Sequence, residues 1–164
     1  MRIFLFTLLI VCFPYAAFAD SENIKDEICL TKQKFFEKSV ELYVQAKNYE
    51  EGKCGFKEDV DEAIRLYTKS AKLGNINAQR ALADLYISLP YRSPSYEVRK
   101  VWIESFAWYM VISKRDDAKD FYIESAKTQM FNLKSQFELN PDLKGAYKAA
   151  KLKGNEYFEK YALP

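Results

Sequence analysis

The sequence contains no histidine among its 164 residues. Imidazole is the usual general base near neutral pH and the commonest zinc ligand, so Ser-His-Asp catalysis, Cys-His catalysis and ordinary zinc sites are excluded. Neighbouring carboxylates occur at Glu50 and Glu51, around Asp59, and at Asp116 and Asp117. Such positions are typical of solvated helix ends. We therefore expect no catalytic residue, no cofactor and no metal site.

The chain also lacks a strong charge of either sign. It has 25 basic and 23 acidic residues, a formal net charge of +2. Removal of a leader that contains Arg2 leaves 24 basic residues against 23, or +1. A balance so close to zero argues against a nucleic-acid partner.

The first 19 residues read as a targeting segment. Arg2 supplies the positive end, residues 3–13 form an apolar core, and Ala17, Phe18 and Ala19 form a small-x-small cleavage site. The core is too short for a permanent membrane anchor. We expect cleavage before Asp20 and export of a soluble chain to a bacterial periplasm, with secretion into the medium as the alternative.

Two cysteines, Cys29 and Cys54, remain after such cleavage. An oxidising compartment favours a disulfide between them. It would close a loop of 25 residues, 54 minus 29, and stabilise the chain by about 3–4 kcal/mol. A helix predicted over residues 33–50, about 25 Å long, separates the two cysteines, so a bond between them requires that its flanks fold back or that the helix is shorter or broken. A disulfide with a second chain and free thiols remain open alternatives.

The most regular part of the chain lies between residues 57 and 86. Asp59 is placed to cap a helix with Glu62 in its first turn, and apolar residues follow at helical spacing. This helix is predicted to end at Gly74, and residues 75–77 supply a turn and the cap of a second helix. Small residues would let the two helices of this hairpin approach closely, namely Ala63, Ala71, Ala78 and Ala83.

One hairpin cannot bury both of its faces, and the pattern recurs at about forty residues. Nine residues occupy the register of a known repeat in order: Gly55, Phe56, Asp59, Ala63, Tyr67, Lys69, Ala71, Gly74 and Ala78. At these residues the chain resembles the Sel-one-like repeat family, relatives of the tetratricopeptide repeats. The resemblance covers residues 35–125. It implies stacked antiparallel helical hairpins that hold another protein.

The predicted fold is all-α with about six helices, a short α/α solenoid of two to three stacked hairpins with a C-terminal capping helix. Repeat-like units occupy residues 35–74 and 75–116, and capping helices occupy residues 118–162, within one domain over residues 20–164. Residues 104–114 are too apolar for one exposed face and should form the centre of the core. The first helix is predicted to present an inner stripe of Phe35, Phe36, Val40, Tyr43 and Ala46.

An insertion over residues 87–104 interrupts the second repeat and reads as a long loop. It has two prolines together with aromatic and basic side chains of the kind that concentrate binding energy at interfaces. A prolonged turn that covers the hairpin ends is the alternative interpretation. The residues expected to bind a partner are Tyr91, Arg92, Tyr96, Arg99 and Trp102.

The function implied by the resemblance is protein binding, as an adaptor or regulator of an envelope complex. An inhibitor of a secreted toxin, of the immunity type, is the first alternative. A structural protein bound to peptidoglycan or lipid is another, through a basic edge made of Lys144, Lys148, Lys151 and Lys153. A cell-wall enzyme would instead need two carboxylates facing each other across a groove.

Overall fold

The structure is a computed structural model that describes the backbone of residues 16–161 and the side chains of residues 27–161. Residues 1–15, which hold most of the predicted targeting segment, lie outside this range, as do residues 162–164. The chain divides into two units, Met1–Lys34 and Phe35–Pro164. Within the described range the first unit contributes only the beginning of the first helix.

The described residues form six α-helices and one short 3-10 helix, and they contain no strand. This confirms the predicted all-α fold, with helices packed against their neighbours. The elements in order are α1 (Ala16–Glu51), α2 (Val60–Lys72), α3 (Ile76–Arg92), α4 (Val98–Ser113), α5 (Asp120–Leu139), η1 (Pro141–Leu143) and α6 (Ala146–Tyr161).

Helices α2 and α3 form the predicted hairpin with the predicted caps. The Asp59 side chain accepts a hydrogen bond from the Glu62 amide, and Asn75 does the same for the Ala78 amide. Gly74 turns the chain at φ +83°, a conformation that disfavours a side chain. The four alanines named above are fully buried, so the helices approach closely and leave room for Tyr67, which is 1% exposed.

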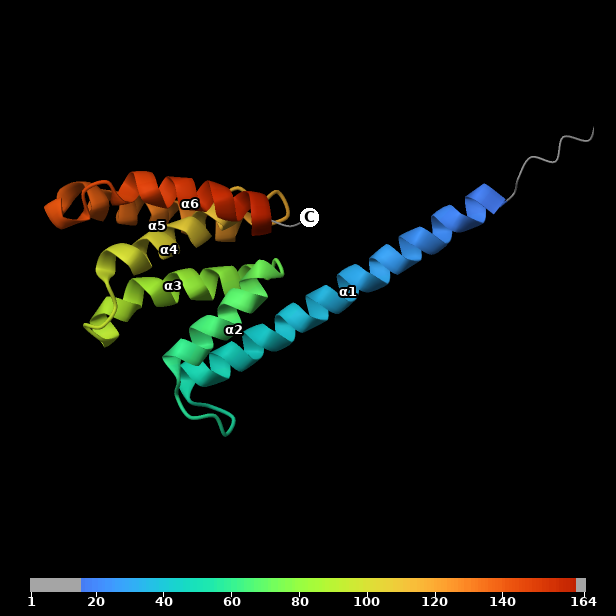
Figure 1. Cartoon of the computed structure of the whole chain (residues 1–164), viewed down its shortest axis with the longest axis horizontal. Coiled ribbons are helices and arrows are strands. Elements are labelled where there is room, and N and C mark those ends of the chain that lie inside the picture. Colours follow the sequence, from blue (N-terminus) through green and yellow to red (C-terminus); the bar gives the residue numbers. More distant parts are fainter. Residues whose placement is uncertain (1–15, 162–164) are drawn as a thin grey trace, which may run out of the picture. The chain divides into compact units, whose positions relative to one another are not determined.

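Helix α4 is the centre of the core, as its apolar sequence predicts. It packs against α3, α5 and α6, and Figure 1 shows it between α3 and the last two helices. A helix that is apolar all round has to be covered on several sides. Its residues from Ser105 to Ile112 are all buried.

Helix α6 returns to the first hairpin at its C-terminal end. The ring of Tyr161 stacks on Trp108 with centroids 5.8 Å apart, and the Lys72 ammonium lies 5.7 Å from the same ring. The buried Gln79 amide donates to the Tyr161 carbonyl at 3.3 Å. The capping helix α6 therefore contacts α2 through Lys72 and α3 through Gln79, as well as its neighbour α4.

The predicted inner stripe of α1 is wrong in part. Ser39, Leu42 and Ala46 are buried, whereas Phe36 is 66% exposed and Val40 is 38% exposed. Ser70 on α2 donates to the Ser39 carbonyl, which shows that α2 lies on this face. Successive residues of a helix point about 100° apart, so Phe36 and Val40 lie on a different side of the helix from the buried positions. Phe35 shares the buried face but is 55% exposed, one turn before the first buried residue.

The insertion is also shorter than predicted. Helix α3 continues to Arg92 and α4 begins at Val98, so only residues 93–97 form a loop. Pro90 is accommodated in the last turn of α3, where the helix closes with a bond from the Ser93 amide to the Leu89 carbonyl. A proline there interrupts only the end of the hydrogen-bond ladder.

The corrected face of α1 gives a stability test. Leu42→Ala should lower the free energy of unfolding by about 2–5 kcal/mol, because Leu42 is buried. Phe36→Ala should change it by less than about 0.5 kcal/mol, because the larger side chain is exposed. Urea unfolding of the two variants measures both values, and a larger loss from Phe36→Ala would contradict the assigned face.

Gly154 marks the close crossing of α6 over α4. A Cβ atom there would lie 3.0 Å from Met110 Cβ and closer still to Met110 Sδ. Alanine favours a helix by about 1 kcal/mol, but overpacking costs about 1–3 kcal/mol. We expect Gly154→Ala to lower the melting temperature, while Glu159→Ala, at an exposed position of α6, leaves it nearly unchanged. A more stable alanine variant would show that the crossing has spare room.

Candidate functional site

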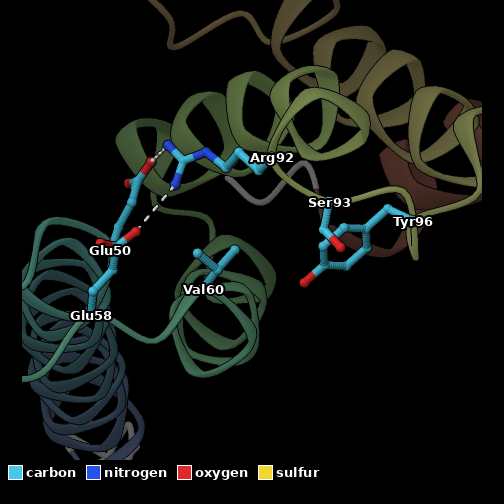
Figure 2. A pocket seen from close by; sticks show the side chains of 6 residues that line it. All are labelled: Glu50, Glu58, Val60, Arg92, Ser93 and Tyr96. Carbon is cyan, nitrogen blue, oxygen red and sulfur yellow. Dashed lines mark ion pairs between the residues drawn. The ribbon is translucent and has the colours of Figure 1, made fainter.

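An open groove lies where the ends of α1, α2 and α3 meet (Figure 2). Its volume is about 620 Å³. We call it the end groove, and it is lined by Glu50, Glu58, Val60, Arg92, Ser93 and Tyr96. Glu50 comes from the end of α1, Val60 begins α2, and Arg92 ends α3. The groove therefore depends on three helix ends and two loops.

The loop after α1 is folded back onto that helix, which places Glu58 beside the groove. The Asp59 amide donates to the Tyr49 carbonyl at 2.9 Å. The rings of Tyr49 and Phe56 meet edge to face with centroids 4.7 Å apart. These contacts hold a segment that would otherwise be free to move.

The guanidinium of Arg92 faces two carboxylates (Figure 2). Its Nη2 atom lies 3.7 Å from Glu50 Oε1, and its Nη1 atom lies 3.9 Å from Glu58 Oε1. Both distances exceed those of a hydrogen bond. The other Glu50 oxygen accepts a bond of 2.8 Å from the Tyr67 hydroxyl. Burial, together with this neighbouring carboxylate, raises the pKa of Tyr67.

Tyr96 is held in the groove wall by a hydrogen bond. Its hydroxyl donates to Asp61 Oδ1 at 2.6 Å. This bond, with a smaller contribution from desolvation, raises the pKa of Tyr96 to about 12. The bond links the loop before α4 to the first turn of α2.

The structure brings together two of the five residues predicted to bind a partner. Arg92 and Tyr96 both line the end groove. Tyr91 precedes Arg92 in the last turn of α3 and is 80% exposed. Two of the predicted residues therefore line the groove, and Tyr91 is exposed on the same helix turn as Arg92.

The other two predicted residues make contacts within the fold. Arg99 donates to the carbonyl of Lys144 at 2.8 Å, in the connection before α6. Trp102 packs against the core, and its indole nitrogen donates to the Ile87 carbonyl at 3.4 Å. Their side chains thus connect α4 to other segments.

Sequence reasoning missed Glu50 and Glu58 as members of this site. Glu50 was assigned to a solvated helix end, although it lies four residues after the buried Ala46 and so continues the inner face of α1. That spacing was a usable signal. Nothing in the local sequence marks Glu58, whose position depends on the folding of the loop.

Cys29 lies in α1 and Cys54 in the loop that follows, with φ +55°. Both are exposed free thiols. The disulfide between them stays a prediction.

Most of the neighbouring carboxylates have structural partners. Asp59 caps α2, and Asp117 accepts two hydrogen bonds from the guanidinium of Arg115, whose side chain is only 8% exposed. This pairing lowers the pKa of Asp117. Among the described residues no three acidic or cysteine side chains are grouped to hold a metal ion.

The four lysines predicted to form a basic edge at the last helix lie in different environments, and Lys144 precedes α6. Lys144, Lys148 and Lys151 are exposed. Lys153 instead pairs with Glu104 on α4, which also accepts a bond of 2.8 Å from the Tyr157 hydroxyl. Within residues 16–161, no helix is at once long enough and apolar enough to cross a membrane.

Comparison of the chain with protein-family models, curated proteins and solved structures found no match.

The bond between Tyr96 and Asp61 can be tested by titration. Asp61→Asn should lower the pKa of Tyr96 from about 12 towards 10, because it removes the carboxylate acceptor and its charge. NMR of tyrosine labelled at the ring carbon that bears the hydroxyl follows this ionisation. The folded-state pKa is raised, so the bond's contribution to stability is complete below pH 10 and is lost as the pH rises through 12.

Glu62→Gln is the matched control, because this neighbouring acid pairs with Arg65 and not with Tyr96. An unchanged Tyr96 titration in Asp61→Asn would show that the hydroxyl has another partner in solution.

Proposed function

We propose that the chain is a non-catalytic protein-binding module, an adaptor or regulator of an envelope complex in the periplasm. The observation that carries this proposal is the end groove, where Arg92 and Tyr96 lie in one open concavity; Tyr91, the residue before Arg92 in α3, is also exposed. Arginine and tyrosine are enriched among the residues that dominate binding energy at protein interfaces. No substrate is needed to account for such a site.

The composition of the groove supports binding better than catalysis. A carboxylate-based hydrolase needs an open space between its two acids for the bond that is cleaved. Glu50 and Glu58 instead both lie near the guanidinium of one residue, Arg92, at 3.7 Å and 3.9 Å. A surface with one apolar, one aromatic, one hydroxyl-bearing and three charged side chains is typical of the polar part of an interface.

Uncovered apolar side chains on α1 give further support. Phe36, Val40 and Val44 follow one another at four-residue spacing and are exposed by 66%, 38% and 49%. Neighbours at this spacing share one side of a helix. Contiguous exposed apolar residues often mark sites of protein interaction.

We propose in addition that the chain is an exported member of the Sel-one-like repeat family. The cap at Asp59, the turn at Gly74 and the burial of Ala63, Tyr67, Ala71 and Ala78 agree with the repeat pattern. Mass spectrometry of the protein recovered from its source cells tests the export proposal, which expects an N-terminus at Asp20.

Affinity capture from the cell envelope tests the binding function. Tagged protein should recover a protein partner in stoichiometric amount, and the double substitution Tyr91→Ala with Arg92→Ala should reduce that recovery at least about tenfold, as loss of two interface anchors does. Quantitative mass spectrometry of the eluates measures the change.

The control is Phe121→Ala with Lys127→Ala on α5, which also removes an exposed aromatic ring and a cation paired with a glutamate. It should leave recovery unchanged. Recovery of glycan or lipid alone, or equal loss from both double variants, would contradict the proposed function.

A further inference from the structure

We infer that the end groove binds a cationic side chain, arginine or lysine, on a short extended segment of the partner protein. This inference rests on the proposed binding function and adds the chemistry of the partner. It follows from the charge balance of the groove, the loose pairing of its carboxylates and the side chains beside them.

The charge balance favours a cation. Among the lining residues, Glu50 and Glu58 supply two negative charges and Arg92 supplies one positive charge. The N-terminus of α2 also attracts anions, but Asp59, Asp61 and Glu62 already lie in its cap and first turn. The groove is therefore left with a surplus of negative charge.

The carboxylates retain capacity to accept hydrogen bonds. Arg92 lies 3.7 Å from Glu50 Oε1 and 3.9 Å from Glu58 Oε1, too far for hydrogen bonds to either. The side chain of Glu58 is 63% exposed and that of Arg92 is 40% exposed. Exposed ion pairs of this kind contribute little stability, so a second cation can share the carboxylates at small cost.

The remaining side chains suit the stem of a long basic residue. Val60 lies in the middle of the groove between the carboxylates and Tyr96 (Figure 2). The methylene groups of arginine and lysine pack on apolar surfaces while their charged ends reach polar groups. An aromatic ring beside them adds attraction for a cation. A volume of about 620 Å³ accommodates a few residues of extended chain.

A pair of capped peptides tests the inference directly. The first is acetyl-Gly-Leu-Arg-Leu-Gly-amide, and the second replaces its arginine by citrulline, which keeps the shape and removes the charge. We expect the arginine peptide to shift the backbone amide signals of Val60, Ser93 and Tyr96 saturably in nitrogen-15 NMR spectra of the full chain. The citrulline peptide should leave them unshifted, and added salt should weaken arginine-peptide binding.

Substitution of each groove carboxylate tests whether its negative charge contributes to peptide binding. Glu50→Gln and Glu58→Gln should each weaken binding of the arginine peptide about 2- to 5-fold, the range for one exposed ion pair. Glutamine at position 50 still offers an oxygen to Tyr67, and position 58 is exposed, so both variants should fold. Glu138→Gln on α5 is the control, because Glu138 is likewise exposed and paired with a cation, Lys134.

Equal binding of the citrulline peptide, shifts confined to residues outside the groove, or no shift at millimolar peptide would overturn the inference. Those results would leave the proposed function standing if envelope capture still depended on Tyr91 and Arg92. Peptide binding without capture of any protein would instead support the groove chemistry and contradict the adaptor function.

Discussion

The fold depends on the burial of helix α4. Its residues from Ser105 to Ile112 are all buried, and most of them carry large apolar side chains that point to every side of the helix, so no single partner helix can cover them. Helices α3, α5 and α6 are each required on a different side. The other helices can then remain amphipathic, with exposed faces that are free for binding. The last turn of α3, which carries Tyr91 and Arg92, is positioned by this packing.

Local sequence was sufficient wherever one residue decides one local structure. The cap at Asp59, the turn at Gly74 and a second cap within residues 75–77 were predicted in this way, and the apolar run of α4 predicted its central position. The predicted inner face of α1 is wrong in part, because Phe36 and Val40 are apolar but exposed. Which side of α1 is covered depends on where α2 lies, and α2 contacts it through Ser39.

In the candidate site, too, some residues could be predicted from local sequence and others depend on tertiary packing. Arg92 and Tyr96 were named from residue type, and both line the end groove. Glu50 was not named, because its role depends on Tyr67 and Arg92, which are 17 and 42 residues away in the sequence. The spacing from Ala46 places Glu50 on the inner face of α1, but its partners are set by tertiary packing and cannot be identified from a local pattern. Arg99 and Trp102 have the residue types of interface anchors, but their hydrogen bonds join α4 to other segments of the fold.

The return of α6 to the first hairpin sets this protein apart from an open array of repeats. In an ordinary solenoid each repeat touches only its neighbours, so repeats can be added or lost without altering the rest. Here the Gln79 amide bonds to the Tyr161 carbonyl, 82 residues along the chain, and Lys72 lies against the Tyr161 ring. Duplicating a hairpin between them would separate these groups. The contacts of Tyr161 therefore depend on the number of helices between α3 and the C-terminal end of α6.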